Sequence, residues 1–82
     1  MVTAQGDVMA NTQYRSPVPV TRNNAEKAFY LLGALMAHLD VWNIDLVAIN
    51  RPSSGPNAGY LIVTISDPIP AEQLAHLLVI QV

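Results

Sequence analysis

Residues 41–66, VWNIDLVAINRPSSGPNAGYLIVTIS, decide the fold of this chain, because two strand-like segments flank a loop rich in glycine, proline and serine. Apolar and other residues alternate along 42–49 and again along 60–66, which is the period of two that a β-strand requires. The pair predicts two adjacent strands. The loop between them lacks the glycine-lysine pattern that binds phosphate and does not open a helix, so we interpret it as a connector.

A helix is predicted on each side of these strands. In TRNNAEKAFYLLGALMAHLD, residues 21–40, Ala28 and three leucines recur at the spacing of a buried helical stripe, and Gly33 is expected to let the helix pack closely on a sheet. In DPIPAEQLAHLL, residues 67–78, Pro70 suits a first helical turn. The last four residues, VIQV, fit either a final strand or more helix, and 16–20, SPVPV, fits a short edge strand.

This order predicts an α+β fold of the ferredoxin-like split βαβ type, either βαββαβ or αββα, with an antiparallel sheet and two helices on one face. Residues 1–16 are polar and without period, so they are predicted as a flexible arm before a single domain over 17–82. The sheet face away from the helices is expected to carry Val47, Ile49, Tyr60 and Ile62. These side chains are too apolar for a purely solvated surface, so we expect them to form an interface.

The composition supports association. Of 82 residues, 51% are hydrophobic and 12% are charged, against roughly 25% charged in an average globular domain. A small domain has the most surface for its volume, so we expect part of that surface to be covered by a second subunit, most simply in a homodimer. A sticky monomer and a fragment of a longer protein are the alternatives.

Charge and hydropathy exclude several partners. The net charge is −2 and no Lys or Arg follows Arg51, so the clustered cations that nucleic acid requires are missing. The longest uncharged apolar run, 28–37, is far shorter than the roughly 20 residues that span a bilayer, so no membrane partner is predicted. There is no cysteine, and the first residues lack the features of a signal peptide. We therefore expect a cytoplasmic protein.

The same segments resemble the ACT domain, a small βαββαβ regulatory module. In LMAHLDVWNIDLVAIN, a helix is followed by a short turn and by the pair Asn43 and Ile44, which resembles the opening of the second strand in that family. In NAGYLIVTIS, Gly59 and Tyr60 resemble the start of the third strand, and residues 70–72 the acidic turn that opens the second helix. The glycine that usually precedes the first helix is absent from NNAEK.

The resemblance implies a non-catalytic regulatory module that binds a small effector, such as an amino acid, at the interface of a dimer. The effector would be held by Thr21, Asn23 and Asn24 before the first helix, together with Asn43. Carboxamides donate and accept hydrogen bonds, and a helix N-terminus favours a carboxylate. Alternatively, Asn23 and Asn24 are helix caps and Asn43 is a turn residue.

Neither a catalytic residue nor a metal site is predicted. Ser53, Ser54 and Ser66 have no histidine nearby in sequence to act as a base, and His38 and His76 lack a third ligand. No cofactor and no enzymatic activity are expected. The alternative to the regulatory module is a small α+β protein that self-associates or binds a protein partner and has no small-molecule ligand.

Overall fold

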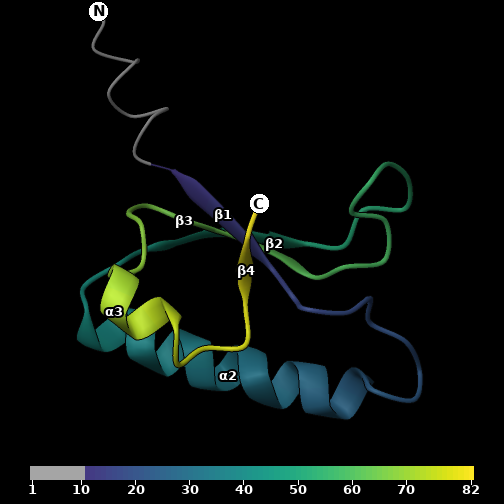
Figure 1. Cartoon of the computed structure of the whole chain (residues 1–82), viewed down its shortest axis with the longest axis horizontal. Helices are drawn as coiled ribbons and strands as arrows, with labels where there is room; N and C mark the ends of the chain where they lie inside the picture. The colour runs from purple at the N-terminus through teal and green to yellow at the C-terminus, as the bar shows by residue number, and fades with distance from the viewer. Residues whose placement is uncertain (1–10) are drawn as a thin grey trace, which may run out of the picture.

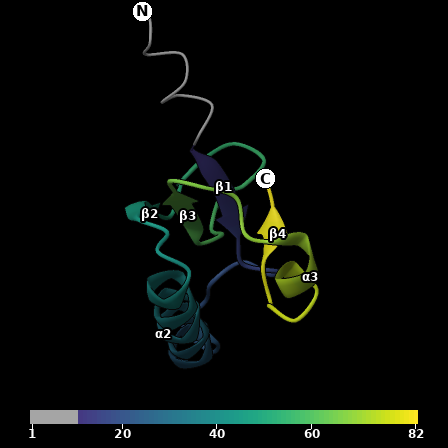
Figure 2. The same ribbon diagram turned by 90° about the vertical axis from the view of Figure 1, so that its left-hand side faces the viewer.

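The computed structural model describes residues 11–82 and shows an α+β fold, in which a four-stranded antiparallel sheet is combined with two helices. The sheet order is β2-β3-β1-β4. Both helices lie on the same side of the sheet in two perpendicular views (Figures 1 and 2). In chain order, the elements are β1 (Thr12–Arg15), α2 (Ala25–Val41), β2 (Leu46–Asn50), β3 (Ile62–Ile65), α3 (Ala71–Leu74) and β4 (Ile80–Gln81).

The first strand lies earlier in the chain than the sequence predicts. β1 is a central strand that pairs antiparallel with both β3 and β4, and its Tyr14 is 1% exposed. The prediction of a flexible arm is therefore wrong for residues 12–15, and the edge strand predicted at 16–20 is not formed. The polar side chains of β1 are held across the sheet: Gln13 donates to the hydroxyl of Thr64 at 3.3 Å, and Arg15 lies 4.3 Å from the ring centroid of Tyr60. The rest of the predicted arm, residues 1–10, lies outside the described residues.

The hairpin of β2 and β3 forms as predicted, and its loop is hydrogen-bonded to the segment that precedes α2. Gly59, which has a φ of 85°, donates its N–H to the carbonyl of Pro52 and accepts from the N–H of Val20 at 2.8 Å. Arg51 donates to the carbonyls of Gly59 and Val20 at 3.2 and 3.1 Å. The loop is thus a connector whose single charged group binds the segment that leads into α2.

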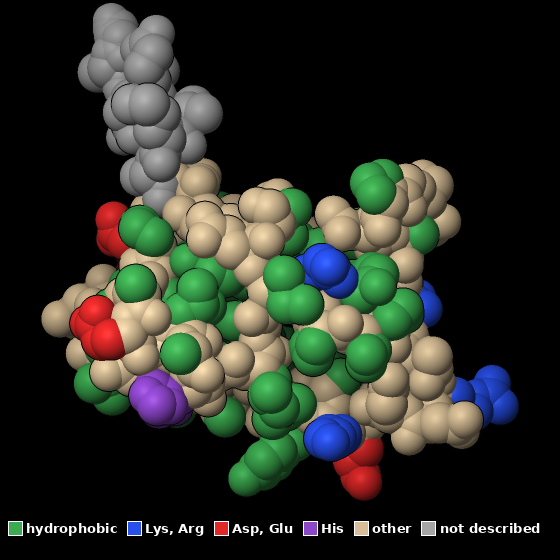
Figure 3. Space-filling model, in the orientation of Figure 1, with side chains coloured by type: hydrophobic (Ala, Val, Ile, Leu, Met, Phe, Trp, Pro, Cys, Tyr) green, Lys and Arg blue, Asp and Glu red, His purple; other side chains and the backbone are tan. Residues whose placement is uncertain are grey.

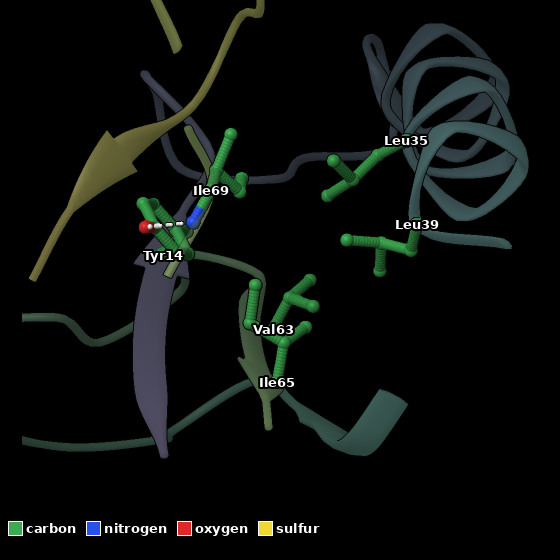
Figure 4. Close-up of a cluster of buried hydrophobic side chains, with 6 residues drawn as sticks. All are labelled: Tyr14, Leu35, Leu39, Val63, Ile65 and Ile69. Carbon is green, nitrogen blue, oxygen red and sulfur yellow. Dashed lines mark hydrogen bonds between the residues drawn. The ribbon is translucent and has the colours of Figure 1, made fainter. Parts of the chain in front are cut away.

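The core lies between the sheet and the helices. Its buried members come from β1, α2, β3 and the turn before α3 and are drawn in Figure 4: Tyr14, Leu35, Leu39, Val63, Ile65 and Ile69. The Tyr14 hydroxyl accepts a hydrogen bond of 2.9 Å from the backbone N–H of Ile69. Pro68 and Pro70 carry no N–H, so this donor is the only backbone donor in residues 68–70, and it is satisfied inside the core.

The helices differ from the prediction in detail. The buried stripe of α2 is confirmed by Leu35 and Leu39, but a Cβ at Gly33 would meet nothing within 4 Å, so close packing on the sheet is not the reason for that glycine. α3 has only four residues, and the chain continues from it in tight turns, with the N–H of Leu77 bonded to the carbonyl of Leu74 at 3.1 Å. The ambiguous end of the chain forms a strand, β4.

Candidate functional site

The structure does not bring the predicted effector residues together within one chain. Thr21, Asn23 and Asn24 precede α2, whereas Asn43 follows it. A helix of 17 residues is about 25 Å long, so Asn43 lies a full helix length from the other three. A site made of all four would require residues from two chains.

Two of these asparagines have local structural roles. The Asn24 carboxamide oxygen accepts from the N–H of Thr21 at 2.7 Å, and its nitrogen donates to the carbonyl of Pro19 at 3.0 Å, so it braces the entry to α2 and does not cap the helix with its side chain. Asn43 has a left-handed φ of 57°. The N–H of Ile44 reaches the carbonyl of Leu39 at 2.9 Å, and that of Asn43 reaches Asp40 at 3.2 Å, which is the Schellman arrangement at a helix C-terminus.

The four residues predicted as an interface do not share one exposed sheet face. Cross-strand partners lie on the same face of a sheet, and Ile49 is opposite Val63, which belongs to the core on the helix side. The register shifts between Leu46 and Ala48, as in a β-bulge. The bulge reverses the alternation of side chains along β2, so Ile49 lies on the opposite face from the one that the sequence predicts.

The other predicted interface residues differ in their surroundings. Ile62 lies on the face away from the core cluster but is already buried, and the ring of Tyr60 is covered by the guanidinium of Arg15. Val47, in the bulge, is 52% exposed. Of the four residues, Val47 is therefore the one that a partner strand would most readily reach.

An apolar groove of about 500 Å³ lies along α2, from Lys27 to His38. One wall is a stripe of α2 at helical spacing, which includes Lys27, Leu31 and His38. The opposite wall is the C-terminal segment 76–79, and Tyr14 of β1 and Val63 of β3 contribute to the sheet side. Figure 3 shows hydrophobic side chains gathered around a hollow in this region, with Lys or Arg side chains beside it.

The groove exists because α3 is short. Along the long axis of Figure 1, α3 lies level with the C-terminal part of α2, and Figure 2 shows the two helices apart on the same side of the sheet, so α3 does not cover the N-terminal half of α2. Ala28 and Leu31 are half-buried and line the groove, yet neither belongs to the core cluster. The apolar stripe of α2 is therefore longer than the part of it that the fold covers.

The charged groups that line the groove are all of one sign. Besides Tyr14, its ionisable residues are Arg15, Lys27, His38 and His76, and no Asp or Glu lines it. The guanidinium of Arg15 is engaged with Tyr60, and the imidazole of His38 is stacked on Trp42 with ring centroids 5.3 Å apart. Lys27 is exposed on the first turn of α2.

The serine hydroxyl that lines the groove is committed to the backbone. Ser16 donates to the carbonyl of Val18 at 2.7 Å and accepts from the N–H of Leu61 at 3.1 Å, so its proton points to a carbonyl and not to a histidine base. Within residues 11–82, no three His, Asp or Glu side chains are placed to hold a metal ion. In the same part of the chain, neither helix has the length and hydropathy to cross a membrane.

The sequence contained part of the signal for the groove. The stripe that includes Ala28 and Leu35 was predicted to be buried, whereas the opposite wall depends on where α3 stops and on the course of the chain through 75–79, which periodicity does not show. Comparisons with protein-family models, with curated proteins and with solved structures found no match to this chain.

Proposed function

We propose that this chain is a non-catalytic module that binds a small molecule in the groove beside α2. The observation that carries the proposal is the groove itself, whose volume of about 500 Å³ lies within the range of roughly 300–1,000 Å³ typical of small-molecule sites. Its mainly apolar lining with a few polar and basic residues is the usual composition of such a site. The proposal keeps the regulatory class that the ACT resemblance implies and places the ligand at a different position.

We further propose that the fold is a ferredoxin-like split βαβ with a shortened second helix. The antiparallel order β2-β3-β1-β4 and the position of both helices on one side of the sheet support this interpretation. The shortened α3 then links the fold to the function, because the space left beside α2 becomes the site.

A thermal-shift screen against amino acids, nucleotides and small apolar compounds tests the proposed function. A ligand at about 100 times its dissociation constant adds roughly 2.7 kcal/mol to the folded state, and each kcal/mol raises Tm by about 4–8 °C in a domain of this size. We expect a shift of more than about 10 °C with at least one apolar compound, and a much smaller shift in Leu31→Gln.

Met36→Gln is the matched control, because Met36 is on α2, is 42% exposed and does not line the groove. Its response to the compound should equal that of the unmodified chain. An unchanged shift in Leu31→Gln, or an equal loss in both variants, would contradict binding in the groove. A shift produced by an amino acid and abolished by Asn43→Ala would move the site back to the position that the ACT resemblance implies.

Self-association is a second candidate function, favoured by β2. This edge strand has the sequence LVAIN, contains no charged residue, and exposes Leu46, Val47 and Ile49. Unprotected edge strands of this kind pair readily with another chain. Sedimentation analysis tests this candidate: a dimer that dissociates in Val47→Lys supports it, and a monomer at all concentrations contradicts it.

A further inference from the structure

From the charges along the groove, we infer that its ligand is an amphiphilic anion, an extended apolar body with one carboxylate. This inference rests on the proposed function and names the class of ligand. It differs from the free amino acid that the ACT resemblance implies. An amino acid carries an ammonium group as well as a carboxylate, and no acidic side chain lines the groove to receive an ammonium.

The distribution of charge is the first argument. The chain has four Lys and Arg residues against six Asp and Glu residues, yet Arg15 and Lys27 are among the residues that line the groove and no acid is. Arg15 is opposite Ile62, on the sheet face away from the core cluster, so Lys27 is the cation whose side chain belongs to the groove side. Both histidines of the chain line it as well. In a protein of net negative charge, a surface bordered only by basic groups is complementary to an anion.

The availability of these groups is the second argument. Arg15 is engaged with the ring of Tyr60, so Lys27 is the cation available to a ligand head group. Asn24, one turn earlier on the same wall, uses one of its two side-chain N–H bonds for Pro19 and retains the other. An ammonium and an amide N–H at this spacing on one face of a helix would both donate to a carboxylate.

The shape of the groove is the third argument. Lys27 and His38 are eleven positions apart on α2, a span of about 16 Å at 1.5 Å per residue. Between them, the wall consists of Ala and Leu side chains. An unbranched or flat apolar body would therefore lie along α2 with its carboxylate near Lys27.

Competition with a neutral dye tests both the proposed binding site in the groove and the inferred class of ligand. Nile red is added to the full chain and displaced by dodecanoate, dodecan-1-ol or dodecylammonium, the two ions kept below the concentration at which they form micelles and the alcohol below its solubility limit. We expect dodecanoate to displace the dye at the lowest concentration and dodecylammonium at the highest. Lys27→Gln should weaken dodecanoate about two- to five-fold, the range expected for one exposed charge pair, and should leave dodecan-1-ol unchanged.

Arg22→Gln is the control for net charge, because Arg22 is exposed and lies outside the groove lining. Its dodecanoate affinity should equal that of the unmodified chain, and Lys27→Arg should retain most of the affinity. If the three probes bind equally, or if Lys27→Gln and Arg22→Gln weaken dodecanoate equally, the inferred ligand class is wrong while the groove remains a binding site. If neither Nile red nor any probe binds, the proposed function itself fails.

Discussion

Replacing Tyr14 by Phe tests the most consequential contact of the fold. The Tyr14 hydroxyl is the acceptor for the N–H of Ile69 at 2.9 Å, and both residues are buried, at 1% and 5% exposure. Phe keeps the ring in the core but leaves that N–H without a partner or access to water. An unsatisfied buried donor costs about 1–3 kcal/mol, which corresponds to a fall in Tm of roughly 4–24 °C for a chain of this size.

The measurement is thermal unfolding followed by circular dichroism, together with amide hydrogen exchange at Ile69. Tyr30→Phe is the matched control, since Tyr30 is 75% exposed and its loss of a hydroxyl should change the free energy of unfolding by less than about 0.5 kcal/mol. In Tyr14→Phe, the Ile69 amide should exchange faster. Equal Tm values for the two variants would refute the reasoning, because residues 12–15 would then not form a central strand that anchors the turn before α3.

Three further substitutions test local features. Asn43→Gly should leave stability unchanged or slightly higher, because glycine adopts the left-handed φ of 57° without strain, whereas Asn43→Val should lower it by about 1–2 kcal/mol in urea unfolding. Gly33→Ala should raise the free energy of unfolding by about 0.5–1 kcal/mol, since the added methyl group meets nothing within 4 Å, and a loss of stability would mean that another chain packs there. Arg51→Ala should speed hydrogen exchange at Val20 while Arg22→Ala does not, because only Arg51 binds that segment, at 3.1 Å.

The parts of the fold that the sequence predicts are those with strong periodicity. α2 is correct because Leu35 and Leu39 mark a helical stripe, and the two central segments form the expected hairpin because their alternation is sustained. β1 was not predicted, because its sequence shows no clear alternation. Its one large buried side chain is Tyr14, and its neighbours Gln13 and Arg15 are polar residues whose partners lie in or beside β3, about fifty positions later in the chain.

The interface and effector residues were assigned wrongly because their roles depend on local backbone geometry. The bulge at Leu46–Ala48 turns Ile49 to the face opposite the one that simple alternation assigns, so a face deduced from period alone is wrong after it. The left-handed Asn43 resembles a ligand-binding asparagine in sequence, but the hydrogen bonds around it show a helix terminus. Residue type alone does not distinguish these roles, because asparagine is favoured in both.

The short α3 is the feature that joins the fold to the proposed function. A longer helix in the segment after Leu74 would pack its own apolar face against Ala28 and Leu31, and would add buried area to a small core. The chain instead turns through residues 75–79 and reaches β1, which secures the sheet edge but leaves the α2 stripe open. If a ligand occupies that stripe, it supplies apolar contacts that the missing helical turns do not, so binding should stabilise the whole domain and not only the groove. Ligand-dependent protection from hydrogen exchange should therefore extend to β1 and β4, and protection confined to α2 would contradict this coupling.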